Sequence, residues 1–171
     1  KEGSQYIVPT NTPLYKDGRI FTANGYGAGA FMLQLNEDAS GVRLLWRNKG
    51  FDPHHGCFVL VDGIIYGSSH GRNGLGKWMA VDWNTGRTRF EMNWGKGVGE
   101  GSVIAADGML YCSDERRGMV GLVRVNPAKF DLVSFFRITR GEGAFWAHPV
   151  IHRGILYVRH GNALMAYKIK G

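Results

Sequence analysis

Histidine is the residue type in this sequence that is best suited to chemistry, because imidazole titrates near neutral pH and can also ligate transition metals. His54 and His55 lie immediately before a predicted strand, and His148 begins the corresponding strand near the end of the chain. Glu100 and Trp146 occupy the positions that match His55 in two further segments of a repeating pattern. If these segments face one another, their side chains predict a ligand pocket or a transition-metal site.

The same residues also fit a structural role in loops and at strand ends. Their spacing matches no established metal motif, so both interpretations stay open. His160 ends a predicted strand in the last repeat and belongs to the same candidate set. We therefore predict a ligand-binding group, with no catalytic residue and no metal ligand assigned, that comprises His54, His55, Glu100, Trp146, His148 and His160.

Two cysteines are the other reactive side chains. Cys57 and Cys112 lie in predicted strands of different repeats. Two cysteines are too few for a disulfide framework. We expect two buried thiols rather than a disulfide.

The elements that must position these residues are repeated four times. Each repeat includes one copy of a short motif in which a turn leads into a strand. The four copies read DGRIF, DGIIY, DGMLY and RGILY. The four turns begin at Asp17, Asp62, Asp107 and Arg153, so they are 45, 45 and 46 residues apart. A constant period in the mid-forties with β patterning indicates propeller blades. We predict one all-β propeller domain over residues 1–171, with repeats at about 9–50, 51–97, 98–142 and 143–171.

Each of the first three repeats contains four predicted strands, and the last contains three. The first strand of each repeat is predicted to begin at Thr12, Cys57, Ser102 and His148. Without a fourth strand, the last blade would expose unpaired backbone groups. The segment Gln5–Val8 precedes the first repeat and is predicted to supply an outer strand.

Two ring architectures are compatible with four repeats. One is a closed four-bladed ring, at the small end of the range for propellers. The other is half of a larger ring, which a homodimer could complete.

One segment resembles a known repeat family. The segment Trp78–Phe90 is similar to the tryptophan-docking motif of PQQ-like (pyrroloquinoline quinone-like) propeller repeats, which runs Ala-x-Asp-x-x-Thr-Gly-x-x-x-Trp. Phe90 stands in place of the tryptophan, and the matching residues are Ala80, Asp82, Thr85 and Gly86. Segments 146–150 and 159–164 resemble the end of bacterial PQQ-binding-like propellers, which commonly have seven or eight blades. The resemblance therefore favours the C-terminal half of a seven- or eight-bladed ring over a closed four-bladed ring.

The resemblance implies two kinds of function. Some relatives are scaffolds or binding modules in the bacterial periplasm or envelope, and others are dehydrogenases that use PQQ with calcium and a vicinal cysteine pair. This sequence has no adjacent cysteines and no compact oxygen-ligand cluster for calcium. We therefore expect a non-catalytic module that binds a protein or small ligand and needs no cofactor. It would be periplasmic, envelope-bound or secreted, with a signal sequence that is not in this chain. A PQQ/calcium-dependent or metal-dependent enzyme with a histidine-lined channel mouth is the alternative.

The charge and hydropathy patterns argue against nucleic-acid binding and against a membrane-spanning segment. The net charge is +7, but the basic residues are spread out and form no run of five, so we expect no nucleic-acid partner. No apolar run reaches 18 residues, so we expect no transmembrane segment.

Overall fold

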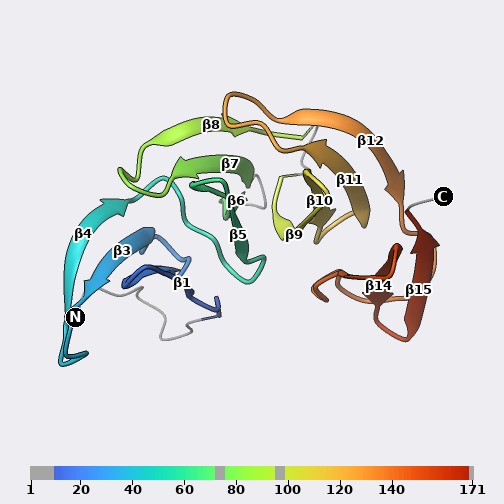
Figure 1. Cartoon of the computed structure of the whole chain (residues 1–171). Coiled ribbons are helices and arrows are strands. Elements are labelled where there is room, and N and C mark those ends of the chain that lie inside the picture. Colours follow the sequence, from blue (N-terminus) through green and yellow to red (C-terminus); the bar gives the residue numbers. More distant parts are fainter. Residues whose placement is uncertain (1–9, 72–75, 95–98, 170–171) are drawn as a thin grey trace.

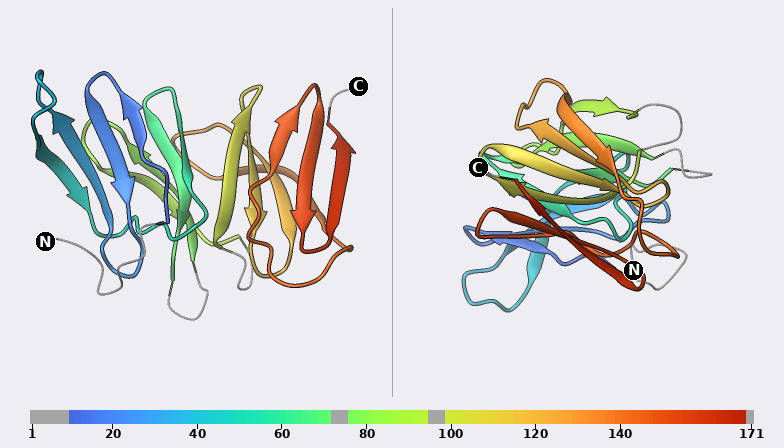
Figure 2. Two further views of the ribbon diagram at one scale, coloured as in Figure 1. Left: turned by 90° about the horizontal axis from the view of Figure 1, so that it is seen from below. Right: turned by 90° about the vertical axis from the view of Figure 1, so that its right-hand side faces the viewer.

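The computed structural model describes residues 10–71, 76–94 and 99–169. These residues form four antiparallel sheets and no helix. Figure 1 shows the sheets arranged as an open arc, and Figure 2 shows the first and the fourth sheet at opposite ends of it. The described part of the chain therefore has the all-β blade architecture that the repeats predict, but it is not a closed four-bladed ring.

The first two sheets each contain four strands in chain order. The first sheet comprises β1 (Leu14–Lys16), β2 (Arg19–Ala23), β3 (Ala30–Leu35) and β4 (Val42–Asn48). The second comprises β5 (Phe58–Val61), β6 (Ile64–Ser69), β7 (Lys77–Asp82) and β8 (Thr88–Met92). In Figure 1, β1 and β5 lie toward the concave side, and β4 and β8 follow the convex rim.

The last two sheets continue the arc with the same meander. The third comprises β9 (Gly101–Ala106), β10 (Met109–Asp114), β11 (Met119–Arg124) and β12 (Asp131–Arg137). The fourth comprises β13 (Val150–His152), β14 (Ile155–His160) and β15 (Ala163–Lys168). It has three strands among the described residues, as the sequence predicts. The proposed outer strand at Gln5–Val8 lies outside the described residues.

The repeated Asp-Gly or Arg-Gly turn connects the first two strands of every sheet. In the second sheet, Asp62 and Gly63 have φ angles of 48° and 77°, and Val61 pairs with Ile64 on either side of them. Positive φ at both central residues defines the two-residue hairpin turn that matches the natural twist of the strands. The same left-handed pair occurs in the other three sheets. The turn that marks the period in the sequence is thus also the element that fixes the register of each blade.

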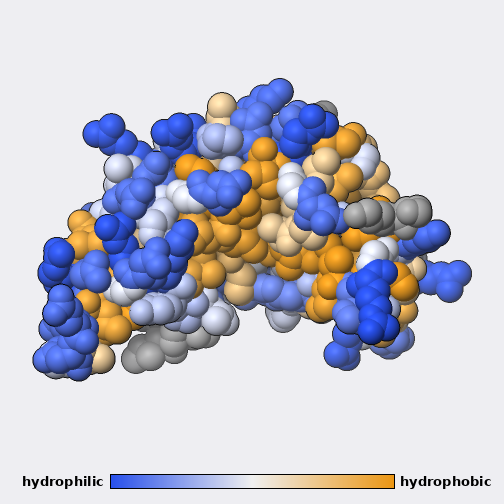
Figure 3. Space-filling view, viewed as in Figure 1, coloured by the Kyte–Doolittle hydropathy of each residue, from blue (hydrophilic) through white to orange (hydrophobic). Residues whose placement is uncertain are grey.

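The core lies between neighbouring sheets. Three clusters of buried apolar side chains fill the spaces between the first and second, second and third, and third and fourth sheets. Figure 3 shows the apolar residues as a band along the arc, with polar residues at its rims. Burying one large apolar side chain of this kind stabilises a fold by about 1.5–3 kcal/mol. The packing between blades therefore holds the arc together.

The docking motif joins the first sheet to the second. The ring of Trp46 on β4 packs against Gly86, where a Cβ would lie 2.5 Å from the indole, and its Nε1 donates to the Trp83 carbonyl at 3.1 Å. Asp82 shapes the Gly86 turn by accepting from the N–H groups of Asn84 and Thr85. The motif is therefore structural.

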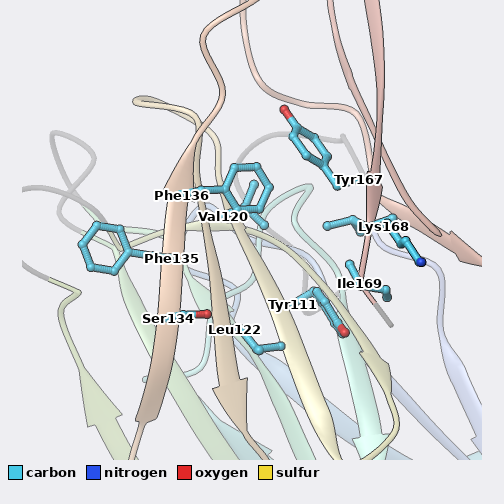
Figure 4. A pocket seen from close by; sticks show the side chains of 10 residues that line it. Tyr111, Val120, Leu122, Ser134, Phe135, Phe136, Tyr167, Lys168 and Ile169 are labelled. Atoms are coloured by element: carbon cyan, nitrogen blue, oxygen red, sulfur yellow. The ribbon is translucent and has the colours of Figure 1, made fainter. Parts of the chain in front are cut away.

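A groove remains between the third and fourth sheets. Its volume is about 280 Å³, and Figure 4 shows aromatic side chains from β12 and β15 on its walls. Phe136 and Tyr167 meet there with their ring centroids 4.6 Å apart. One wall of the groove is formed by β15, the outermost strand of the fourth sheet among the described residues.

The two end sheets carry apolar side chains on their outward faces. On the first sheet, cross-strand pairing places Tyr15, Ile20, Leu33 and Leu44 in one row, and Tyr15 and Leu44 are 67% and 50% exposed. On the fourth sheet, Leu164 is 71% exposed beside Met165, which packs into the core. Alternating side chains point to opposite faces of a strand, so Leu164 points away from the third sheet.

Candidate functional site

The candidate residues gather at one edge of the sheets. In each blade the first strand starts, and the antiparallel second strand ends, at the same edge. His54 and His55 precede β5, and Glu100 precedes β9, while His70 and Glu115 follow β6 and β10. Side chains that are far apart in the sequence are thereby brought to the same end of the arc.

Two histidines of the second blade face two carboxylates of the third. His70 Nδ1 lies 3.1 Å from Glu100 Oε2, and His55 Nε2 lies 3.2 Å from Glu115 Oε2. His54 lies between the other two imidazoles, with ring centroids 4.6 Å from His55 and 5.2 Å from His70. We call these five residues the histidine–carboxylate cluster.

A backbone contact keeps the second and third blades close beneath this cluster. A Cβ on Gly56 would lie 2.0 Å from the Gly101 carbonyl oxygen, so only glycine fits there. Ser68 Oγ accepts a hydrogen bond from the Gly101 N–H and donates one to the Gly101 carbonyl, both at 2.9 Å. The cluster therefore rests on a rigid contact between two blades.

The first blade contributes an aromatic ring through its β2–β3 loop. Tyr26 lies with its ring centroid 4.4 Å from that of His54. The loop is anchored by the buried Asp52, whose carboxylate accepts from the N–H groups of Gly27 and Gly29 at 2.8 and 2.6 Å. Tyr26 is thus held in place by the same segment that leads to the histidines.

The fourth blade contributes two side chains through the segment before β13. The Trp146 ring lies 5.3 Å from the His55 ring and is 63% exposed. His148 Nε2 donates to the His55 carbonyl at 3.0 Å. The exposed indole thus forms part of the rim of the site.

Burial and mutual repulsion set the protonation of the cluster. Burial lowers the pKa of His54 and His55, and neighbouring histidines lower both further. Burial and the nearby Glu100 carboxylate raise the pKa of Glu115 to about 7. Near neutral pH His54 and His55 are therefore neutral and the Glu115 carboxyl group is partly protonated, so the site can both donate and accept hydrogen bonds.

The structure brings five of the six candidate residues together and separates the sixth. His54, His55, Glu100, Trp146 and His148 belong to one connected group of side chains. His160 instead stacks on Phe145 at 3.6 Å, and its two ring nitrogens lie 2.8 Å from the carbonyls of Arg140 and Gly143. His160 therefore lies apart from the group that the other five residues form, and its ligand-binding role stays a prediction.

Sequence reasoning missed three residues of the site. They are Tyr26, His70 and Glu115. His70 and Glu115 are 45 residues apart, the same period that separates the turns. Applying the repeat register to the ends of the second strands would have identified both, whereas nothing in the sequence singles out Tyr26.

The cysteines differ from the expectation in one respect. Both are free thiols, and Cys112 is buried as expected. Cys57 is only half-buried and precedes β5, because its φ of 58° is incompatible with a strand. The predicted start of that strand was therefore wrong by one residue.

The described residues contain neither a grouped set of metal ligands nor the vicinal cysteine pair that the resemblance implies for a quinone enzyme. Across residues 10–71, 76–94 and 99–169, no group of three or more His, Cys, Asp or Glu side chains could hold a metal ion. The two cysteines lie in different blades, so they do not form a vicinal pair. The cavity inside the cluster has a volume of about 10 Å³, which is room for about one water molecule.

Comparison with known proteins gives matches to solved structures alone. No protein-family model matches the chain, and no curated protein matches its sequence. The structure of BamB from Moraxella catarrhalis has a TM-score of 0.65 and 16% identity, over 92% of this chain and 43% of that one. Quinohemoprotein alcohol dehydrogenase ADHIIG from Pseudomonas putida HK5 has a TM-score of 0.64 and 15% identity, over 91% of this chain and 29% of that one. The computationally designed Ika8 protein has a TM-score of 0.60 and 12% identity, over 92% of this chain and 45% of that one.

These likenesses show the fold. The chain has a β-propeller fold, which confirms the fold class predicted from its sequence. It spans less than half the length of each of the three matched structures, as part of a propeller does. In the described part of the chain, no helix is long and apolar enough to cross a membrane.

Proposed function

We propose that this chain is a non-catalytic binding module that presents the histidine–carboxylate cluster, with Trp146 at its rim, to a protein or a small ligand. The observation that carries the proposal is that all four blades contribute to one group of side chains. Tyr26 comes from the first blade, the histidines from the second, the carboxylates from the third and Trp146 from the fourth. Loops that converge from a rigid scaffold are typical of binding sites.

The chemistry of the cluster suits recognition of a polar group beside an apolar one. Neutral imidazoles offer one donor and one acceptor each, and the partly protonated Glu115 can act as either. Trp146 adds a large exposed surface, and tryptophan is enriched among the residues that dominate binding energy. A polar protein loop or a small molecule with a flat apolar part would match both features.

The proposal extends to the whole ring and to its location. The outward apolar faces of the first and fourth sheets fit further blades, so we propose that the chain is half of a larger ring. The sequence resemblance to envelope proteins supports a periplasmic, envelope-bound or secreted location. A PQQ- or metal-dependent enzyme stays the alternative prediction.

Selection from a phage-displayed library of random peptides tests the binding role of the site. We expect peptides selected on the wild-type chain to lose at least about tenfold in affinity for Trp146→Ala and His55→Ala, a typical cost for a binding hot spot. Phe135→Ala is the matched control, because Phe135 is a similarly exposed aromatic (59%) on the convex strand β12. Peptides that bind Trp146→Ala as well as wild type would place recognition elsewhere. Dye reduction with an alcohol substrate, PQQ and calcium would contradict the non-catalytic assignment.

A further inference from the structure

The groove between the third and fourth sheets lies where the other two interfaces hold an aromatic ring. On the fourth strand of each four-stranded sheet, one residue pairs directly beside a register shift in the ladder. That residue is Trp46 on β4, Phe90 on β8 and Ser134 on β12. Trp46 and Phe90 pack into the apolar cluster between their own sheet and the next one. Ser134 lines the groove instead, so the third interface lacks the ring that the first two contain.

The groove retains the aromatic wall on which such a ring packs. The ring centroid of Trp46 lies 5.8 Å from that of Phe21, and the centroid of Phe90 lies 6.4 Å from that of Tyr66. Phe21, Tyr66 and Tyr111 are 45 residues apart and occupy the same position on β2, β6 and β10. Tyr111 is one of the residues that line the groove (Figure 4). The third interface therefore has the wall without the side chain that covers it in the first two.

The repeat register also places a hydrogen-bond acceptor at the groove. In the first interface, Trp46 Nε1 donates to the Trp83 carbonyl at 3.1 Å. Trp83 follows β7, and its N–H donates to the Gly63 carbonyl at 3.0 Å. Ile169 follows β15, and its N–H donates at 2.9 Å to the carbonyl of Gly154, the equivalent turn glycine. Because Ile169 lines the groove, its carbonyl is the corresponding acceptor for a ring N–H.

The groove has the size and the lining for one flat bicyclic molecule. Its volume is about 280 Å³, whereas an apolar cavity of about 150 Å³ is enough to bind benzene. Apolar side chains from both sheets line it, and they include Val120, Leu122, Phe136, Leu156 and Tyr167. The ring of Phe135 points away from the groove and meets Trp94, with the two centroids 6.1 Å apart (Figure 4).

We propose that this groove is a binding site for a small planar aromatic molecule of the size of indole that carries a ring N–H. The ligand takes the place of the aromatic side chain that Ser134 does not supply. Its ring packs on Tyr111, and its N–H donates to the Ile169 carbonyl. A preformed apolar groove with one well-placed polar group is typical of small-molecule sites. The groove shares no residue with the histidine–carboxylate cluster, so this inference does not depend on the function proposed above.

The test is a calorimetric titration of the native chain with indole. We expect a dissociation constant of about 1 mM or tighter, which is modest for a ligand of this size. Benzofuran has the same shape but no N–H, so it should bind roughly three- to tenfold more weakly, the usual effect of one hydrogen bond. Equal affinities would overturn the role of the Ile169 carbonyl, and no binding of either compound would overturn the site.

A pair of variants at Ser134 tests whether the ligand lies in the groove. Ser134→Trp should lower the affinity for indole by at least about tenfold and raise the midpoint of thermal unfolding, because the new ring fills the groove from within. Ser134→Ala is the matched control, since it removes the hydroxyl without filling the groove and should keep the wild-type affinity. A folded Ser134→Trp that binds indole as tightly as the wild type would place the ligand elsewhere and overturn the proposal.

A second measurement keeps the proposal falsifiable if Ser134→Trp does not fold. In the methyl NMR spectrum of the wild-type chain, bound indole should shift the resonances of Val120, Leu122 and Leu156, which line the groove. The methyl resonances of Leu60, which packs in the first interface, should stay in place. If a second copy or another part of the molecule covers the groove, indole will cause no such shifts, and the proposal fails.

Discussion

At the scale of single residues, Glu115 is the group whose titration most affects the site. Its pKa is raised to about 7 by burial and by Glu100, so the folded state holds a proton that the unfolded chain releases near its ordinary value of 4.5. A group of this kind stabilises the fold at low pH, and its contribution is lost as the pH rises toward 7. His54 and His55 act in the opposite direction, because their lowered pKa values make the fold less stable as the pH falls below about 6.5.

The substitution Glu115→Gln isolates this contribution. Between about pH 5 and pH 8, we expect the variant to gain about 1–3 kcal/mol in unfolding free energy relative to the wild type, because glutamine cannot ionise. The measurement is urea unfolding followed by tryptophan fluorescence at several pH values. Glu91→Gln is the control, because Glu91 forms an exposed ion pair with Lys77, and such pairs contribute less than about 1 kcal/mol. A stability difference between wild type and Glu115→Gln that stays constant with pH would show that Glu115 ionises normally.

At the scale of elements, the packing of Trp46 against the second sheet depends on the absence of a side chain at Gly86. We expect Gly86→Ala to destabilise the fold by about 2–4 kcal/mol, because the new methyl group meets the Trp46 ring and the φ of 69° strains alanine. Gly63→Ala is a matched control, since Gly63 has a φ of 77° but nothing within 4 Å of an added Cβ. Its cost should be about 1 kcal/mol from backbone strain alone.

Thermal and urea unfolding of the two variants measure the difference. If the blades pack as described, the excess cost of Gly86→Ala over Gly63→Ala reports the Trp46 contact. Equal costs for the two variants would mean that the ring of Trp46 moves away freely. Repeating Gly86→Ala in a Trp46→Leu background should remove most of the excess.

The sequence is most informative where local chemistry determines structure. Asp62 and Gly63 can be recognised because a two-residue turn needs left-handed residues, and the recurrence of this turn predicts the blades. His55 and Glu100 were placed together because the repeat register carries over to the loops. Tyr26 could not be predicted, because its place beside His54 depends on how Asp52 holds the β2–β3 loop. His160 lies apart from this group, because its ring stacks on Phe145 and contacts two backbone carbonyls instead.

At the scale of the whole molecule, the open arc presents two faces that resemble the interior of a propeller. The first sheet has an exposed apolar row that includes Tyr15 and Leu44, and the fourth sheet exposes Leu164. The chain has four sheets, so two copies would provide eight blades, which is within the usual range of four to eight for a propeller. We therefore expect the first sheet of each copy to pack against the fourth sheet of the other, which closes a ring with two equivalent interfaces.

Native mass spectrometry and light scattering measure this association directly. We expect a dimer of twice 19.0 kDa at micromolar concentration. Leu44→Arg and Leu164→Arg, which bring a charge into opposite sides of the interface, should each yield a folded monomer, because an unpaired buried charge is strongly unfavourable. Val133→Arg is the control, because Val133 is 46% exposed on the convex strand β12 and lies away from both end faces. A wild-type chain that stays monomeric, or a dimer that tolerates both arginines, would contradict this pairing. The end faces would then have to be covered by blades other than those of a second copy.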